Sequence, residues 1–301
     1  MLTPPRPRMT AFDAALYVGL VLSWGFSWLA VHYQIGVVAP EVSLVWRFAL
    51  AAPLMFLLAV ARGESLRFPL RTHATLILFG LTLFSMNFLL FYYGNYYLAS
   101  GLFAVIFSLT SIVNVGLGAL VLRMPIDRRV VLGALLGAGG VAAMFYPELV
   151  KTHFDRDALF GLALGVCGTL IFCCGSTLSS LSQRRGLPVI ASSAWGMLYG
   201  CVIMTALAAM LGKPFVVEPT LTYLGALLYL AVIASVLAFA CYLILLGRIG
   251  ADRAGYATVM FPVIALAAST AVEGYRWTFL ALLGLAAVLV GNLLVLRTPR
   301  R

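Results

Sequence analysis

Polar side chains that could bind a solute lie inside long apolar segments of this sequence. Asn87 and Asn114 each place an amide near the middle of such a segment, and Arg47 places a charge inside another. A polar residue in these surroundings usually faces other protein groups or a water-filled cavity. For both amides, contact with a solute and a hydrogen bond between helices are equal alternatives. Arg47 could pair with Glu41 or bind the carboxylate of a solute, and a structural role is preferred because it lies near its segment's end.

Aromatic and small polar residues recur at spacings of three and four in several apolar segments, which places them on single faces of helices. Such mixed faces suit an amphipathic organic solute. The candidate solute-binding residues are Trp24, Phe84, Asn87, Phe91, Phe107, Ser111, Asn114, Thr169, Cys173, Ser176, Ser235, Phe239 and Tyr242. The alternative is packing and hydrogen bonding between helices, which is preferred for any single Ser or Thr.

Prolines and tryptophans inside the apolar segments have two interpretations each. Pro53 and Pro262 lie mid-segment, where each frees a carbonyl that could accept from an ammonium group or merely kinks the helix. Trp24 lies deep, so lining a cavity and filling the core are equal alternatives. The tryptophans nearer segment ends are predicted to lie in the interfacial belt, and these are Trp28, Trp46 and Trp277.

Several kinds of chemistry are disfavoured. The five cysteines lie in apolar runs without metal-ligand spacing, and the three histidines are scattered near loops, so no metal or cofactor is expected. An integral membrane enzyme would need such groups clustered at one depth. No Asp or Glu lies mid-segment, which disfavours exchange of lipophilic cations for protons and favours a neutral or zwitterionic solute.

The composition defines the elements that position these residues. Hydrophobic residues make up 63% of the 301 residues and charged residues only 10%, whereas a soluble domain carries about 25% charged residues. The sequence therefore predicts an all-α integral membrane protein in a lipid bilayer. Ten segments approach the roughly 20 apolar residues that a spanning helix needs. They cover residues 11–31, 43–61, 74–93, 100–122, 129–146, 159–181, 190–211, 222–246, 252–272 and 277–296.

Basic residues in the loops predict the orientation. With the N-terminus inside, fifteen Lys and Arg fall in inside segments and four in outside loops. Both tails, residues 1–10 and 297–301, are therefore predicted to be cytoplasmic. The net charge of +10 reflects this topology, and nucleic-acid binding is excluded as its explanation.

An internal repeat is the most informative pattern. Trp46 matches Trp195 and Gly63 matches Gly212 at an offset of 149, while Gly133 matches Gly284 at an offset of 151. Further matches join Gly19 to Gly168, Ser43 to Ser192 and Gly140 to Gly291. The repeats would be residues 11–146 and 159–296, joined by a periplasmic linker at 147–158. Because five helices are an odd number, the second repeat would be inverted, an architecture typical of transporters with a midplane site.

The chain resembles the drug/metabolite transporter superfamily in its ten-helix EamA-type branch. The resemblance rests on the run Leu22 to Phe26, on Arg47 and on Pro262 followed by Glu273. It also rests on the glycine patterns from Gly133 to Gly140 and from Gly284 to Gly291. The first repeat departs from the pattern, with Ser111 in place of the proline and Leu122 in place of the glutamate. This departure favours a structural role for Pro262 and Glu273.

Within the branch, the chain is most similar to bacterial amino-acid exporters of the YddG type. The resemblance implies export of aromatic or other neutral amino acids and related metabolites across the bacterial inner membrane by alternating access. Another metabolite class, such as a nucleotide precursor or a sugar, is the first alternative, and a membrane enzyme is the second.

Overall fold

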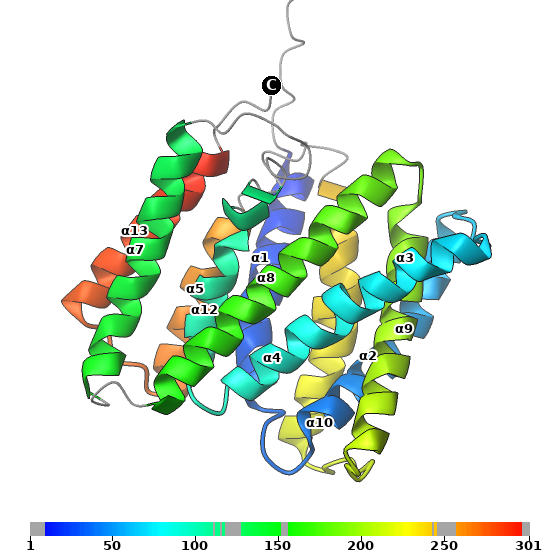
Figure 1. The fold of residues 1–301 in the computed structure, drawn as a ribbon, viewed down its shortest axis with the longest axis horizontal. Coiled ribbons are helices and arrows are strands. Elements are labelled where there is room, and N and C mark those ends of the chain that lie inside the picture. Colours follow the sequence, from blue (N-terminus) through cyan, green and yellow to red (C-terminus); the bar gives the residue numbers. More distant parts are fainter. Residues whose placement is uncertain are drawn as a thin grey trace, which may run out of the picture.

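The chain folds into a bundle of helices (Figure 1). The computed structural model describes residues 10–110, 112–114, 116–117, 128–151, 156–242, 244–245 and 257–296, which contain no strand. The elements are α1 (Ala11–His32), α2 (Pro40–Ala61), α3 (Leu70–Leu81), η1 (Thr82–Met86), α4 (Asn87–Gly94), α5 (Ser100–Ser108), α7 (Arg128–Lys151), α8 (Arg156–Arg184), α9 (Val189–Met210), α10 (Leu221–Leu228), η2 (Tyr229–Leu237), α12 (Ala257–Val272) and α13 (Phe279–Leu296).

Seven helices are long and apolar enough to cross a membrane. They are Ala11–His32, Pro40–Ala61, Leu70–Gly94, Arg128–Pro147, Arg156–Arg184, Val189–Met210 and Leu221–Tyr242. Three shorter apolar helices, Ser100–Asn114, Met260–Val272 and Phe279–Val295, occupy the other three predicted segments. The all-helical membrane class is confirmed, while the count of ten spans stays a prediction.

Local sequence signals explain where several helices begin and end. Thr10 caps α1 through a reciprocal bond with Asp13, and Pro40 occupies the first turn of α2, where no backbone donor is lost. Gly63 follows α2 and Gly212 follows α9, and both adopt positive φ angles, of 71° and 63°. Only glycine takes this conformation without strain, which explains why the two matched helices stop at matched positions.

Two π-helical segments interrupt long helices. In η1, the Ser85 hydroxyl donates to the Gly80 carbonyl at 2.7 Å, and in η2 the Ser235 hydroxyl donates to the Leu230 carbonyl at 2.8 Å. Each bond reaches five residues back, to a carbonyl that the wider turn leaves available. Ser85 and Ser235 are 150 positions apart, within the offsets predicted for the repeat.

Helices α7 and α13 lie side by side and run antiparallel (Figure 1). A Cβ at Gly133 would lie 2.6 Å from the Gly291 carbonyl oxygen, and one at Gly291 would lie 2.6 Å from the Gly133 oxygen. Gly140 and Gly284 approach equally closely, at 2.5 Å in both directions. Backbone therefore meets backbone, which small residues permit in membrane helices. Gly133 thus faces Gly291, which is the repeat match of Gly140, and Gly140 faces Gly284, which is the repeat match of Gly133.

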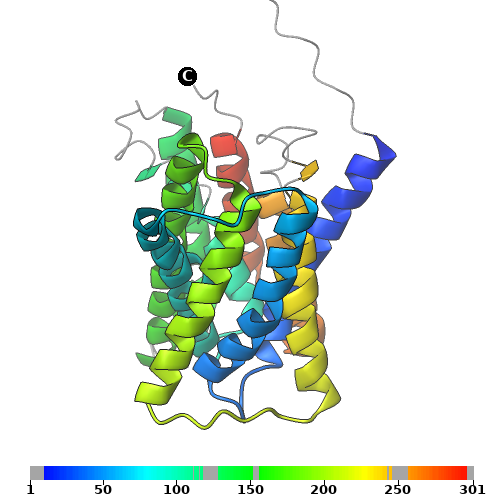
Figure 2. The ribbon, with the colours of Figure 1, turned by 90° about the vertical axis from the view of Figure 1, so that its right-hand side faces the viewer.

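Helices α2 and α9 form a second reciprocal pair. The Trp46 indole donates to the Val216 carbonyl beyond the end of α9, and the Trp195 indole donates to the Leu66 carbonyl beyond the end of α2, both at 3.0 Å. An antiparallel two-fold relation between the helices produces such an exchange. The start of α1 and the end of α13 also lie at the same end of the bundle (Figures 1 and 2).

Candidate solute-binding site

A cluster of aromatic rings joins five helices. Phe91 of α4 is 2% exposed, and its ring meets Trp28 of α1 edge-on at 5.1 Å. Phe107 of α5 lies 5.7 Å from Phe91 and 4.7 Å from Phe172 of α8. Phe261 of α12 lies 6.1 Å from Phe107. Edge-to-face rings at these distances attract one another beyond their hydrophobic burial. We call Trp28, Phe91, Phe107, Phe172 and Phe261 the central aromatic cluster.

The sequence predicted Phe91 and Phe107 in this cluster and missed the other three. The prediction that Trp28 lies in the interfacial belt is wrong, because the residue is 8% exposed and packed between Phe91 and Phe107. Its spacing of four from Trp24 was the available signal, since two tryptophans one turn apart share a helix face.

Asn87 and Asn114 carry buried amide atoms without hydrogen-bond partners among the described residues. Asn87 is fully buried at the junction of η1 and α4, and both its Oδ1 and Nδ2 are unpaired. The Asn114 Oδ1 is likewise buried and unpaired. An unsatisfied buried polar group costs about 1–3 kcal/mol. These unpaired amide atoms of Asn87 and Asn114 are therefore candidates for hydrogen bonds to a bound solute.

The α8 candidates mostly bond within the protein. The Thr169 hydroxyl donates to the Gly165 carbonyl at 2.9 Å, one turn back in its own helix. Cys173 is fully buried, and its thiol donates to the Thr110 carbonyl of the facing segment at 3.9 Å. Ser176 is half-buried, and its carbonyl accepts from Ser180. These contacts agree with the packing alternative for single small polar residues.

Trp24, Phe239 and Tyr242 form a second group of rings, where α1 meets the helix that contains η2. The Tyr242 ring lies 5.8 Å from Trp24 and 6.5 Å from Phe239. The Trp24 indole donates to the Ala234 carbonyl in η2 at 3.3 Å. Because a π-helical turn leaves carbonyls available, this bond fixes the Trp24 ring against η2.

Phe84 lies in a different part of the bundle. Its ring contacts Phe48 at 5.8 Å and fills the space left by Gly196 of α9, while its backbone lies against Gly200. It is 8% exposed within a large apolar core. The structure therefore separates Phe84 from Phe91 and Phe107, with which the sequence grouped it.

Arg47 is 4% exposed, and the predicted pair with Glu41 is absent from the structure. Glu41 instead accepts from the Tyr93 hydroxyl at 2.5 Å. Arg47 donates from Nε and Nη2 to the Ser235 hydroxyl, at 3.2 and 3.1 Å, and its Cζ lies 4.3 Å from the centre of the Phe88 ring. Of the two alternatives for Arg47, the pair with Glu41 is therefore not found, because both residues bond to partners on other helices.

The remaining candidates divide by position. Pro53 is exposed on the outside of α2, which favours the kink interpretation there, whereas Pro262 is buried in α12. Ser111 and Leu122 lie outside the described residues. Glu273 accepts from the backbone nitrogen and hydroxyl of Ser100 and from the Ser269 hydroxyl, and pairs with His32 at 3.1 Å. It thus ties α1, α5 and α12 together, a structural role.

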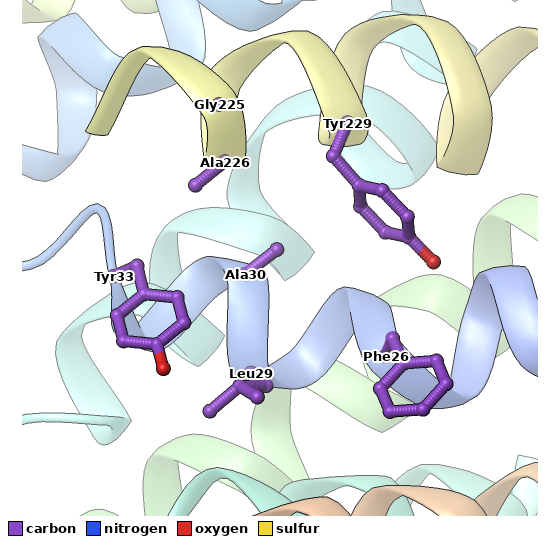
Figure 3. A pocket seen from close by; sticks show the side chains of 7 residues that line it. All are labelled: Phe26, Leu29, Ala30, Tyr33, Gly225, Ala226 and Tyr229. Carbon is purple, nitrogen blue, oxygen red and sulfur yellow. The ribbon is translucent and has the colours of Figure 1, made fainter. Parts of the chain in front are cut away.

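An apolar groove runs along the outside of the bundle between α1 and α10 (Figure 3). It has a volume of about 210 Å³ and is lined by Phe26, Leu29, Ala30, Tyr33, Gly225, Ala226 and Tyr229. Phe26 is 43% and Tyr33 is 39% exposed, so the groove opens outward. None of the candidate solute-binding residues lines it.

The bundle matches a known fold and family. A solved crystal structure aligns over 95% of this chain and 96% of its own, with a TM-score of 0.68 and 17% identity, and this likeness shows the fold. The model of the EamA-like transporter family matches residues 13–146 and again residues 159–297. The chain belongs to the EamA-like transporter family. It is therefore a multi-pass membrane transporter, and the family resemblance found in the sequence is confirmed.

Curated relatives of this EamA-like chain align over nearly its full length. Protein PagO of Salmonella typhimurium (strain LT2) is 24% identical over 286 residues, covering 93% of this chain and 91% of its own. A protein of Escherichia coli (strain K12) named probable amino-acid metabolite efflux pump is 24% identical over 294 residues, covering 94% of each. The uncharacterized transporter YyaM of Bacillus subtilis (strain 168) is 23% identical, covering 95% of this chain and 94% of its own.

Proposed function

We propose that this EamA-like transporter exports aromatic or other neutral amino acids and related small metabolites from the cytoplasm of a bacterium. It would work by alternating access in the inner membrane, with ten helices in two inverted repeats and both termini inside. The observation that carries the solute class is the central aromatic cluster, together with the Asn87 amide and the Asn114 Oδ1, which have no hydrogen-bond partners among the described residues. An aromatic wall with a few polar groups is the usual composition of a small-molecule site.

Further observations support the topology. The fifteen-to-four distribution of basic residues favours cytoplasmic termini, and the two ends of the described bundle lie together. The reciprocal pairs Gly133–Gly291, Gly140–Gly284 and Trp46–Trp195 are what an inverted repeat would produce. A periplasm-active reporter fused after Arg301 should be silent, and a strong signal there would contradict the orientation.

Amino-acid efflux is tested in proteoliposomes that hold the purified protein. The vesicles are loaded with labelled aromatic, neutral, acidic and basic amino acids, and in parallel with a sugar and a nucleoside. We expect aromatic or neutral amino acids to leave fastest, with empty liposomes as the background. Release of the sugar or nucleoside without release of any amino acid would replace the proposal with its first alternative.

Asn114 tests whether the unpaired amides bind the solute. A hydrogen bond to a charged solute group contributes about 1.5–3 kcal/mol, which is roughly ten- to a hundredfold in affinity. Asn114→Ala should weaken the apparent affinity by that factor without lowering the melting temperature. Ser182→Ala is the matched control, because Ser182 is 6% exposed and its hydroxyl is satisfied by the Leu178 carbonyl at 2.9 Å. A stable Asn114→Ala protein with unchanged affinity would remove Asn114 from the site.

A further inference from the structure

Arg47 is a buried charge without an acidic partner. It lies about two turns into α2 from Pro40 and is 4% exposed. No carboxylate of the described residues lies within 4.0 Å of its guanidinium. The one ion pair found among those residues joins His32 to Glu273 and does not involve Arg47. A charge removed from water is costly unless another charge and further hydrogen bonds compensate. The folded chain supplies only part of that compensation.

Ser235 holds the guanidinium from one side. Its hydroxyl donates to the Leu230 carbonyl at 2.8 Å, so the oxygen lone pairs are free to accept from Arg47 Nε and Nη2. The π-helical turn of η2 makes this arrangement possible, because it leaves the Leu230 carbonyl available to the side chain. Ser235 therefore orients the guanidinium but supplies no negative charge.

The surroundings of Arg47 supply neutral acceptors but no carboxylate. Tyr92 of α4 lies against the guanidinium, where its hydroxyl oxygen can accept from Arg47, while its own proton is donated to Gln34 Oε1 at 2.6 Å. Gln34 is 1% exposed, and its Nε2 has no hydrogen-bond partner among the described residues. The cluster thus combines a fixed cation with an amide that is joined to it through Tyr92 and whose Nε2 is unpaired among the described residues. A carboxylate is the ligand that satisfies both, because it accepts several hydrogen bonds and guanidinium binds it in a planar, two-pronged geometry.

We propose that Arg47 binds the carboxylate of the transported solute, with Ser235 as the residue that positions the guanidinium and Gln34 as an additional donor. This inference rests on the proposed function and specifies which part of an amino acid is recognised there. The rings of Phe88 and Phe48, 4.3 and 5.4 Å from Arg47 Cζ, stabilise the cation between transport events.

The test uses two solutes that differ only in the carboxylate. Binding of an aromatic amino acid and of its decarboxylated amine is measured on the same purified protein in nanodiscs, by the concentration dependence of thermal stabilisation. The wild type should prefer the amino acid by about tenfold or more, because a hydrogen-bonded ion pair is lost with the amine. Arg47→Gln should abolish this preference and leave the affinity for the amine within about twofold.

Two serine variants provide a matched comparison that does not depend on the folding of Arg47→Gln. Ser235→Ala should reduce the preference for the amino acid severalfold, because the guanidinium loses its orienting acceptor. Ser85→Ala removes the corresponding serine of η1, which bonds only to the Gly80 and Leu81 carbonyls, and should leave the preference unchanged. Arg47→Lys should retain part of the preference, because it keeps the charge but not the planar geometry.

The outcomes separate this inference from the proposed function. If Ser235→Ala or Arg47→Gln lowers the affinity for both solutes equally, Arg47 has only a structural role and the inference is wrong, while amino-acid transport stands. A wild-type protein that binds the amine as tightly as the amino acid likewise overturns the carboxylate site. If the wild type binds and transports no amino acid at all, the proposed function fails first.

Discussion

The two π-helical segments, η1 and η2, contain the same serine-to-carbonyl hydrogen bond but pack against different kinds of residue. Ser85 and Ser235 make the same bond to a carbonyl five residues back. Against η1, however, α9 presents Gly196, which the Phe84 ring covers, and Gly200, which the Phe84 backbone meets. Against η2, α2 presents Arg47, whose guanidinium bonds to Ser235.

The difference shows which properties the contact of η1 with α9 shares with the contact of η2 with α2. A serine that satisfies the carbonyl freed by a wide turn keeps the backbone of each segment the same. The side chains opposite are under no such constraint, and Arg47 in α2 corresponds by the offset of 149 to Gly196 in α9. The contact between η1 and α9 is thus closed by packing, while the contact between η2 and α2 holds a charge.

Removal of the Phe84 ring is the strongest test of the packed contact between η1 and α9. Phe84 is 8% exposed and contacts Phe48, so Phe84→Ala should lower the free energy of unfolding by about 3–5 kcal/mol. Solute affinity should be unchanged in the protein that remains folded. Phe279→Ala serves as the control for denaturation in detergent, because Phe279 is 77% exposed. A stable Phe84→Ala protein with weakened solute binding would place Phe84 in the site instead.

A methyl group at Gly200 tests the close approach of α9 to η1. Its Cβ would lie 2.8 Å from the Phe84 carbonyl oxygen, a backbone atom that cannot rotate away. Gly200→Ala should therefore cost about 1–3 kcal/mol in thermal unfolding. Gly225→Ala in α10 is the matched variant, since nothing lies within 4 Å of its Cβ and no loss is expected. Equal melting temperatures for both variants would show that α9 and η1 can move apart at little cost in free energy.

The reciprocal tryptophans should behave alike, in contrast to the two π-helical segments. Trp46→Phe and Trp195→Phe each remove one indole hydrogen bond of 3.0 Å, at a cost of about 0.5–1.5 kcal/mol. Melting temperatures of the two variants should agree within error. A much larger loss for Trp195→Phe would point to its contact with His73, at 4.8 Å, as a feature of one half alone.

Asn87 marks the smallest expected change in stability. It directly follows η1 and carries an amide without a partner among the described residues, whereas the position 150 residues later is Leu237, the last residue of η2. Asn87→Leu should raise the free energy of unfolding by about 1 kcal/mol or less, because it removes an unsatisfied buried group of similar size. If Asn87 also contacts the solute, the same protein should bind it about two- to tenfold more weakly. Lower stability would instead reveal that the amide has a structural partner.

Sequence patterns predicted the helices well because each rests on a local property. The positions of α2 and α9 follow from local features without reference to the rest of the chain. These features are a run of apolar residues, a proline at the start, and the glycines at 63 and 212 after the end. The π-helical segments could not be predicted in this way. Thr82–Met86 and Tyr229–Leu237 consist of ordinary helix residues, and their sequences alone do not distinguish a wide turn from an α-helical one.

Site residues were harder to predict because burial depends on distant partners. Trp28 lies near a helix end in sequence, but rings from α4 and α5 cover it. Arg47 and Glu41 share one helix and yet take their partners from η2 and α4. Helix periodicity shows which residues share a face, while the neighbour of that face is decided by the packing of the whole bundle.

The paired glycines of α7 and α13 have a mechanical consequence. Carbonyl oxygens of one helix sit directly against the other at Gly133–Gly291 and at Gly140–Gly284, seven residues or about two turns apart along α7. Sliding or rolling either helix would push these oxygens into the facing backbone at both points. We therefore expect the two helices to move as one rigid unit, so that any rearrangement during transport takes place elsewhere in the bundle.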